Sequence, residues 1–274
     1  MTLSGRDISE LLAVNGLHPS RALGQNFVTD PNTVRRIARL AGVREGDRVV
    51  EIGAGLGSLT LALAETGASV TAIEVDRGIV PVLRGVVEPH GVRVIEADAR
   101  TIDWPTVLGD ERWTLVANLP YNVATPLVAD LLDDVPQIDR MLVMVQREVG
   151  ERLAAAPGDE AYGAVSVKVA YWARAEVVGR VPRTVFLPKP NVESVLVRIE
   201  RRIVPAVAAD VDPEWLFAVV RAGFAHRRKM LRGALAGVAT VEQLEAAGVA
   251  PTARAEELDV EAWGRIAREA AARG

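Results

Sequence analysis

The chain has 274 residues, which suits one large domain or a large domain with a small one. Apolar residues make up 49% of it and charged residues 25%, the balance of a globular protein with a core. Cysteine is absent, which excludes disulfides, thiolate metal sites and cysteine nucleophiles, and a cytoplasmic location is expected. No signal peptide or membrane-spanning run is present, so no membrane association is expected.

The charge of the chain is unevenly distributed. Its formal net charge of −4 argues at first against a nucleic-acid partner. Between Arg180 and Leu235, however, 11 basic residues stand against 5 acidic ones. This asymmetry predicts a basic face on an acidic protein. The preference for Arg over Lys suits phosphate contacts, although a bias in codon use is the favoured explanation.

The first half of the chain alternates β-rich runs with helical patterns. The runs are Arg48–Ile52, Val70–Val75, Val92–Glu96, Trp113–Asn118 and Arg140–Gln146. Helical patterns lie between them at Leu56–Glu65, Arg77–Val87 and Ala124–Leu132. Such alternation predicts an α/β fold, with a parallel sheet and helices on both of its faces. Ligands of such sheets bind at the carboxyl ends of the strands.

The second half is harder to interpret. Ala164–Trp172 alternates like a strand but also allows a helix, whereas the apolar residues of 195–199 alternate more clearly. After Asp212 and Pro213 the pattern turns helical. We therefore expect one domain over residues 1–206 and a small α-helical domain over 207–274.

A glycine-rich turn follows the first run. Gly53, Gly55 and Gly57 come between that run and a helical pattern, and glycine allows a ligand to approach the backbone closely. The next run ends in Glu74, whose carboxylate can accept both ribose hydroxyls of an adenosine. In the dinucleotide fingerprint the third glycine would stand at Ser58. The observed spacing, with Glu51 ahead of it, instead resembles the S-adenosylmethionine loop of class I methyltransferases. A plain tight turn is the structural alternative.

Asp98 follows the third run and is placed to bind the adenine amino group of the same cofactor. An aspartate after a strand is otherwise a common helix cap. Because the glycine loop and Glu74 precede it in register, a ligand role is favoured.

The sharpest signal is Asn118-Leu119-Pro120-Tyr121, directly after the fourth run. The exocyclic nitrogen of adenine is a poor nucleophile, and accepting both of its N–H bonds returns electron density to it. The Asn118 side-chain oxygen can accept one bond, and the main-chain carbonyl of Leu119 or Pro120 can accept the other. Tyr121 can stack on a base that has left its helix. This chemistry needs positioning rather than a metal, and no cluster of metal ligands is seen.

Together these motifs resemble the ribosomal RNA adenine dimethyltransferase family, in particular its small-subunit members. The resemblance runs nearly end to end and extends to the following segments: Leu23–Val28, with Val28 where leucine is usual, Gln146–Arg152, Ala161–Gly163, Phe186–Pro190 and Phe224–Lys229. It implies a class I, Rossmann-like methyltransferase sheet, a helix after Tyr162 and the cofactor S-adenosyl-L-methionine.

The resemblance also implies roles for single residues. The cofactor would be held by Asn26, Val28, Gly53, Gly55, Glu74, Asp98 and Asn118. The target base would meet Asn118, Leu119, Pro120, Tyr121 and Phe186, although Phe186 is equally well explained as a core residue. Arg227, Arg228 and Lys229 are expected on a basic helix that contacts RNA phosphates, with a solvated helix face as the alternative.

The implied reaction converts two adjacent adenosines near the 3′ end of 16S rRNA to N6,N6-dimethyladenosine. The substrate would be the immature small ribosomal subunit and the enzyme a monomer. Rival hypotheses are a 23S rRNA adenine methyltransferase of the antibiotic-resistance type, a ribosome-assembly factor that acts mainly by binding, and a DNA adenine methyltransferase. The segments around Phe186 and at Phe224–Lys229 favour the small-subunit hypothesis over the 23S one.

Overall fold

The computed structural model describes residues 2–20, 22–120 and 123–271. It opens with α1 (Gly5–Val14), β1 (Phe27–Val28) and α2 (Pro31–Ala41). Then strands and helices alternate through β2 (Arg48–Ile52), α3 (Ser58–Ala64), β3 (Ser69–Glu74), α4 (Val80–Val87), β4 (Arg93–Glu96), α5 (Trp104–Leu108), β5 (Trp113–Asn118), α6 (Ala124–Asp134) and β6 (Ile138–Gln146). The five strands of this stretch confirm the five predicted runs, with ends that shift by at most two residues.

The chain continues with α7 (Arg147–Ala154), α8 (Ala164–Trp172), β7 (Ala173–Val181), β8 (Phe186–Leu187) and β9 (Ser194–Arg201). The last helices are α9 (Pro213–Ala225), α10 (Leu231–Ala234), α11 (Val241–Ala246) and α12 (Val260–Ala271). Short 3₁₀ turns lie at Glu88–His90, Arg183–Val185 and Ala255–Glu257.

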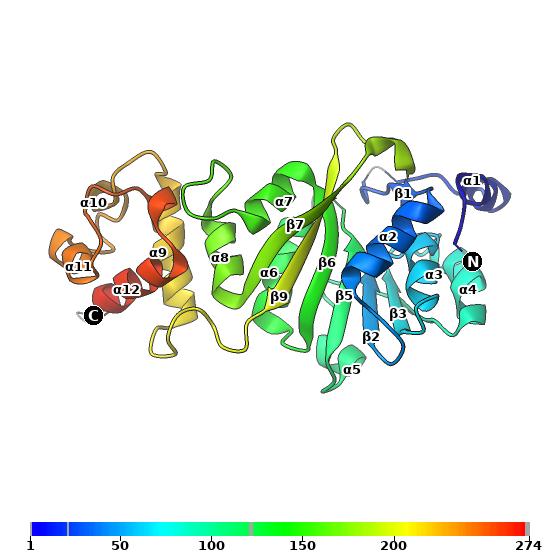
Figure 1. Ribbon diagram of the computed structural model, residues 1–274, viewed down its shortest axis with the longest axis horizontal. Helices are drawn as coiled ribbons and strands as arrows, with labels where there is room; N and C mark the ends of the chain where they lie inside the picture. Colours follow the sequence, from blue (N-terminus) through cyan, green and yellow to red (C-terminus); the bar gives the residue numbers. More distant parts are fainter. Residues whose placement is uncertain (1, 21, 121–122, 272–274) are drawn as a thin grey trace. The chain divides into compact units, whose positions relative to one another are not determined.

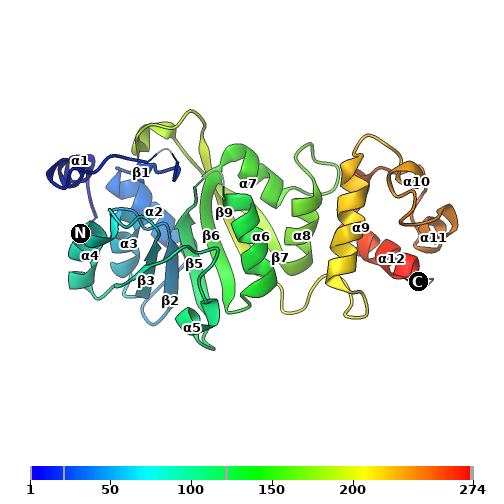
Figure 2. The ribbon, with the colours of Figure 1, turned by 180° about the vertical axis from the view of Figure 1, so that it is seen from behind.

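The main sheet has seven strands in the order β4-β3-β2-β5-β6-β9-β7. Strands β4 to β6 pair in parallel, as the sequence predicts, but β9 runs antiparallel to β6, from Arg140 opposite Glu200 to Gln146 opposite Ser194. Helix α2 lies over one face of the sheet (Figure 1) and α6 over the opposite face (Figure 2). The strand order reverses between β2 and β5, where open α/β sheets bind ligands.

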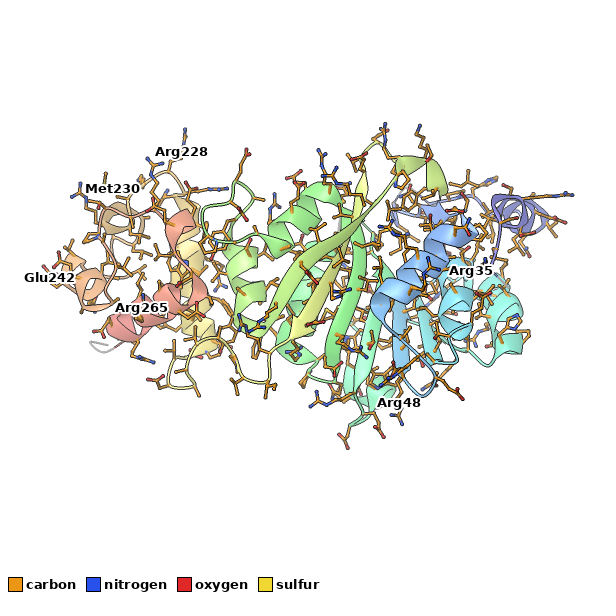
Figure 3. The ribbon with its side chains drawn as sticks, in the orientation of Figure 1. Arg35, Arg48, Arg228, Met230, Glu242 and Arg265 are labelled. Atoms are coloured by element: carbon orange, nitrogen blue, oxygen red, sulfur yellow. The ribbon has the colours of Figure 1, made fainter. Side chains whose placement is uncertain are left out.

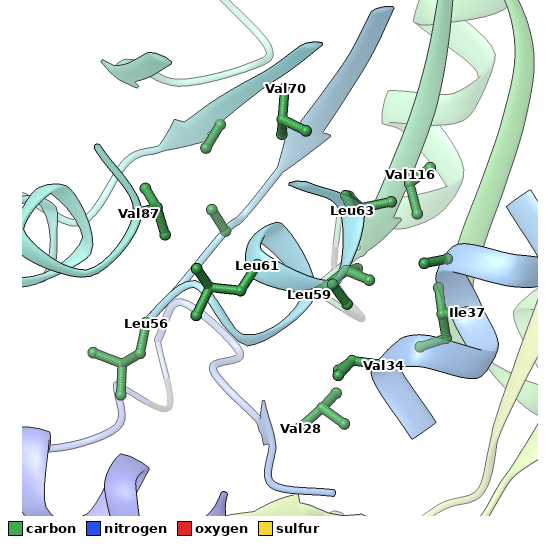
Figure 4. Packing of buried hydrophobic residues seen from close by; sticks show 14 of the residues in the cluster. Val28, Val34, Ile37, Leu56, Leu59, Leu61, Leu63, Val70, Val87 and Val116 are labelled. Atoms are coloured by element: carbon green, nitrogen blue, oxygen red, sulfur yellow. The ribbon is translucent and has the colours of Figure 1, made fainter. Parts of the chain in front are cut away.

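The core that supports this edge lies between the sheet and helices α2 and α3. Val34 and Ile37 of α2 pack with Leu59 and Leu63 of α3 and with Val116 of β5 (Figure 4). Helix α3 begins later than its apolar pattern, because Gly57 still belongs to the turn with a φ of 90°. A Cβ on Gly57 would lie 2.6 Å from the Val87 side chain, so this turn requires glycine.

The ambiguous segment is helix α8. Its alternation of valines misled because nearly every position is apolar, and the buried positions include Ser166 as well as Val167 and Val169. The Ser166 hydroxyl accepts the Gly163 N–H and donates to the Arg152 carbonyl, which anchors the first turn of the helix. The helix implied by the family resemblance is confirmed.

The contacts divide the chain into two units, residues 1–150 with 176–200 and residues 151–175 with 201–274. In the second unit, α8, α9 and α12 pack against one another around a hydrophobic cluster that includes the buried Trp263 of α12. Helix α9 begins as the sequence predicts, with Pro213 in its first turn and the Asp212 carboxylate accepting two backbone N–H bonds. The second unit also takes in residues 151–175, so it is larger than the predicted domain 207–274, and that domain boundary remains a proposal.

Gly150 tests the packing of α7 on the sheet. A Cβ there would lie 2.2 Å from a methyl carbon of Val195 in β9. We expect Gly150→Ala to lower the free energy of unfolding by about 1–3 kcal/mol, because overpacking displaces the strand. Gly85→Ala is the matched control in α4, where nothing lies within 4 Å, and should be neutral or stabilising by about 0.4–1 kcal/mol. Denaturant unfolding of both variants measures the difference, and equal stabilities would refute the packing argument.

Candidate active site

The predicted ligand residues meet at the carboxyl edge of the parallel strands. Gly53 follows β2, Glu74 ends β3 and Asn118 ends β5. These three residues line one cleft, whose other wall is formed by residues 23–28 of the N-terminal segment. The sheet order places the cleft at the reversal point between β2 and β5.

The glycine loop is fixed by backbone hydrogen bonds. Gly53, Gly55 and Gly57 all have positive φ angles, of 73°, 56° and 90°. The Gly53 N–H donates to the Ile73 carbonyl at 2.8 Å, and the Gly55 N–H donates to the Glu74 carboxylate at 2.8 Å. The loop is thus tied to the end of β3, and its glycine backbone faces the cleft without side chains.

Glu74 is a buried carboxylate that lines the cleft. Its Oε2 accepts the N–H of Gly55, and its Oε1 accepts those of Val75 and Asp76, each at 2.9 Å. Burial raises its pKa, and the three backbone hydrogen bonds oppose that rise. A carboxylate has about four acceptor positions, so Oε2 keeps one for a ligand hydroxyl.

Glu51 lies beneath the same loop and is 2% exposed. The Thr60 hydroxyl donates to its Oε2 at 2.5 Å. Burial raises the pKa of Glu51 to about 8, with a further contribution from the Glu74 charge. This carboxyl group is therefore mainly protonated at neutral pH.

Ser58 adds an unsatisfied group to the cleft. Its hydroxyl is buried and has no hydrogen-bond partner in the part of the chain that the structure describes. Buried polar groups are rarely left without a partner, so this oxygen points to a polar ligand atom. With the side-chain-free glycine backbone and the Glu74 carboxylate, the donors and acceptors fit a nucleoside-containing cofactor with a charged end.

Asn118 is held by a bond to the N-terminal segment. Its side-chain Nδ2 donates to the Asn26 main-chain carbonyl at 3.0 Å. This assigns Oδ1 as the atom left to accept a hydrogen bond. Asn26 and Val28 line the cleft, as predicted.

The two carbonyls that follow Asn118 differ in their availability. The Pro120 carbonyl accepts the N–H groups of Val123 and Ala124, at 3.2 and 3.1 Å, at the start of α6. The Leu119 carbonyl accepts none within residues 2–20, 22–120 and 123–271. Of the two acceptors left open by the sequence, the structure therefore favours Leu119. Tyr121 lies outside the described residues.

Asp98 lines an adjoining hollow together with Ile52, Ile73 and Pro120. Its carboxylate pairs with the Arg100 guanidinium at 2.7 Å and accepts the Arg100 N–H at 2.9 Å. These hydrogen bonds, above all the one from the Arg100 side chain, lower the pKa of Asp98. The side chain thus borders the predicted cofactor site as a carboxylate with a fixed orientation.

Phe186 does not lie where the sequence analysis expected it. Its side chain is 5% exposed, belongs to the hydrophobic core and does not line the cleft. Strand β8 carries it opposite Val28 of β1, and its ring packs within the cluster of buried core residues. Phe27, at 8% exposed, is the aromatic residue of the cleft wall, and a Cβ on Gly55 would lie 3.0 Å from its ring. The position of Phe186 therefore agrees with the alternative explanation, in which it is a core residue.

The expected basic helix is also corrected. Arg227, Arg228 and Lys229 follow the end of α9 and lie in a turn. Arg227 is used internally, since it pairs with Glu256 at 2.6 Å and donates to the Glu160 carbonyl at 2.7 Å. Arg228 and Lys229 are exposed, and the Arg228 side chain points away from the fold (Figure 3).

Sequence reasoning gives no role to several residues of the cleft. Phe27 and Gln25 stand in a segment marked only by its resemblance, and Ser58 is visible only as a departure from the dinucleotide fingerprint. Their one sequence signal is their position beside Asn26 and Gly57, because burial and hydrogen bonding are not visible in sequence. Among the described residues, no group of three acidic or histidine side chains could hold a metal ion.

Known proteins resemble the chain over most of its length. A curated relative from Thermobifida fusca, "Ribosomal RNA small subunit methyltransferase A", is 50% identical over 97% of this chain and 95% of its own. Its namesake from Cutibacterium acnes is 49% identical over 94% of this chain and 91% of its own. The crystal structure of the 23S rRNA methyltransferase ErmE matches with a TM-score of 0.71 and 27% identity, over 89% of this chain and 98% of that one.

The fold and the cleft define a class I methyltransferase. A dimethyladenosine transferase from Plasmodium falciparum shares the fold, with a TM-score of 0.71 and 22% identity over 86% of this chain and 94% of its own. The model of the family "Ribosomal RNA adenine dimethylase" matches residues 18–272. The chain belongs to this family, which makes it a methyltransferase of ribosomal RNA adenines that uses S-adenosylmethionine.

The pKa of Glu51 makes stability depend on pH. Its folded pKa of about 8 exceeds the ordinary value of 4.5, so the stability it contributes is complete below pH 4.5 and is lost as the pH rises through 8. Gln cannot ionise, so Glu51→Gln should not lose stability in this way. The free energy of unfolding of the variant minus that of the native chain should therefore increase by a few kcal/mol between about pH 5 and 9. Thermal unfolding across this range, with the exposed Glu10→Gln as control, measures it. A difference between Glu51→Gln and the native chain that stays constant with pH would contradict the assignment.

Proposed function

We propose that this chain transfers methyl groups from S-adenosyl-L-methionine to N6 of two adjacent adenosines near the 3′ end of 16S rRNA, in the immature small ribosomal subunit. The observation that carries the chemistry is the convergence of two acceptors, Asn118 Oδ1 and the Leu119 carbonyl, at the cleft that also holds the glycine loop and Glu74. The names of the curated relatives support the choice of the small subunit.

The cofactor, when bound, supplies an electrophilic methyl group on a sulfonium. Glu74 would accept a ribose hydroxyl through Oε2, and Asp98 would accept the adenine amino group in the adjoining hollow. Gly53 and Gly55 would form the floor, and Asn26, Val28 and Asn118 would close the other side. The unpartnered Ser58 hydroxyl would meet a polar atom at the amino-acid end.

The target adenosine enters the same cleft with its base out of the stack. Asn118 Oδ1 accepts one N6–H bond and the Leu119 carbonyl accepts the second. Both bonds direct the nitrogen lone pair out of the ring and toward the methyl group. Catalysis is then mainly positioning in a near-attack geometry, and the proton leaves the positively charged product amine without a strong base. Tyr121 would stack on the base.

The alternative substrate, 23S rRNA, is less well supported. ErmE acts on that RNA, and its structure is 27% identical to this chain. The relatives named for the small subunit reach 50% identity over nearly the whole length. Counting methyl groups on both RNAs after reaction with labelled cofactor separates the two hypotheses. A protein that only binds the ribosome would label neither RNA.

The remaining parts of the proposal concern setting and RNA contacts. The enzyme acts as a monomer in the cytoplasm, with residues 1–206 as the catalytic domain and 207–274 as the RNA-contacting domain. In the described part of the chain, no helix is long and apolar enough to cross a membrane. Of the three predicted phosphate contacts, we retain Arg228 and Lys229, because Arg227 is engaged by Glu256 and by a backbone carbonyl.

The acceptor role of Asn118 predicts a specific loss. Asn118→Ala should lower the single-turnover rate of methyl transfer by about 10²–10³-fold or more, the usual effect of removing one preorganised polar group. Binding to small subunits should persist, because phosphate contacts lie elsewhere, while cofactor affinity falls partly. Rapid-quench assays with labelled cofactor, together with filter binding, measure both quantities. A variant with nearly native turnover would eliminate the mechanism.

The exposed cations predict a change in salt dependence. Arg228→Ala with Lys229→Ala should weaken binding to small subunits and flatten the plot of log affinity against log salt by about 0.7–0.9 per lost phosphate contact. Cofactor affinity should not change. As a control, Arg227→Ala should instead cost folding stability, on the order of 1 kcal/mol, because it breaks two internal bonds. An unchanged slope in the double variant would show that neither cation touches phosphate.

A further inference from the structure

Residues 23–28 form one wall of the cleft and carry Asn26 and Val28, which are assigned to the cofactor. The segment is held at its far end, where Phe27 and Val28 pair with Leu187 and Phe186. The Thr29 N–H and hydroxyl both donate to the Val185 carbonyl. Its near end needs a separate anchor, because residues 22–26 belong to no helix or strand.

Gln25 provides that anchor with both ends of its side-chain amide. Its Nε2 donates to Oδ2 of Asp76 at 2.7 Å, and its Oε1 accepts the Ser20 N–H at 2.8 Å. Asp76 is itself fixed, since its Oδ1 accepts the Gly78 N–H and its own N–H donates to Glu74, both at 2.9 Å. Each polar atom of the Gln25–Asp76 contact therefore has a defined donor or acceptor role.

The residue after Gln25 controls the orientation of Asn118. The Asn26 carbonyl accepts the Asn118 Nδ2–H at 3.0 Å. Rotating this amide by 180° would bring Oδ1 against the carbonyl oxygen, where two acceptors repel. The direction in which Asn118 presents Oδ1 thus depends on where the segment holds the Asn26 carbonyl. A second bond, from the Asn26 side chain to the Gly24 carbonyl at 3.0 Å, stiffens the segment at this point.

We propose that Gln25 and Asp76 are positioning residues for methyl transfer. Their hydrogen bond holds residues 22–26 so that the Asn26 carbonyl orients the Asn118 amide with Oδ1 toward the target adenine. The same bond joins this wall to Glu74 through the Asp76 N–H, so the ribose end and the target end of the cleft share one network. The inference rests on the proposed role of Asn118 as acceptor and extends it to two residues outside the reacting groups.

The donor and acceptor pattern allows a rescue experiment. In Gln25→Glu two carboxylates face each other across the 2.7 Å contact, so the bond is lost. In Asp76→Asn the introduced NH2 group must face either the Gly78 N–H or the NH2 group of Gln25. In both orientations two hydrogen-bond donors face each other. In the double variant every group is matched again. The carboxylate at position 25 accepts the Ser20 N–H and an amide proton from position 76, whose remaining oxygen accepts the Gly78 N–H.

We expect each single variant to reduce the single-turnover rate at saturating cofactor and small subunits by about tenfold, and the double variant to return to within about threefold of the native rate. Gln137→Glu is the matched control. It makes the same change at a half-buried residue that does not line the cleft, so it should keep the native rate.

A second readout does not depend on turnover. The side-chain amide protons of Asn118, identified by their loss in Asn118→Ala, should shift in NMR spectra of both single variants and return in the double variant. Inactivity of the native protein on small subunits would overturn the proposed substrate while leaving this readout intact. Native rates and shifts in Gln25→Glu would overturn the positioning role. A double variant as slow as the slower single variant would also overturn it. The same holds if thermal melts show that both single variants are unfolded and that the double variant is unfolded too.

Discussion

The active site depends on the burial of two carboxyl groups, Glu51 and Glu74, beneath one glycine loop. Burying two adjacent charges without compensation is very unfavourable, and the fold resolves this by treating them differently. Glu74 receives three backbone N–H bonds and remains the acceptor of the cleft. Glu51 receives one hydroxyl, and burial raises its pKa to about 8. The glycines allow this arrangement, because only a backbone with positive φ brings the Gly55 N–H to Glu74.

Periodicity was sufficient to predict the features that a parallel sheet imposes. Once the five runs are aligned, Gly53, Glu74 and Asn118 must share an edge, and they do. Prediction from the sequence was incomplete where the type of element or the orientation of a side chain depends on burial rather than on hydrophobic periodicity. Strand β7 escaped detection because it is an edge strand with exposed charges such as Arg174. Periodicity alone left α8 open between a strand and a helix, because a helix buried on most sides resembles a strand. The family resemblance placed Phe186 near the target base but could not show that its ring is buried in the core beside the β1–β8 pair.

The hydrogen bonds of the fold show which of two similar residues is available to bind a ligand, and the sequence does not. Leu119 and Pro120 both offer a carbonyl, but the first turn of α6 uses that of Pro120, whereas the Leu119 carbonyl accepts no backbone N–H from the described residues. Arg227 and Arg228 are adjacent and chemically identical, yet one joins Glu256 to the Glu160 backbone and the other is exposed. In both pairs the residue already satisfied by the fold is unavailable to a ligand, and no property of the isolated sequence shows which one that is.

The cleft explains the reaction but not the choice of RNA. Under the proposed function, Asn118 Oδ1 and the Leu119 carbonyl would recognise an amino group, and every adenosine carries the same one. The class I sheet does not decide between the two RNAs either, since the structure of the 23S rRNA methyltransferase ErmE matches this chain with a TM-score of 0.71. Selection between RNAs must come from surfaces that touch phosphates and RNA shape outside the cleft. Under the proposed function, exposed cations such as Arg228 and Lys229 would meet that requirement, because they belong neither to the core nor to the cofactor site.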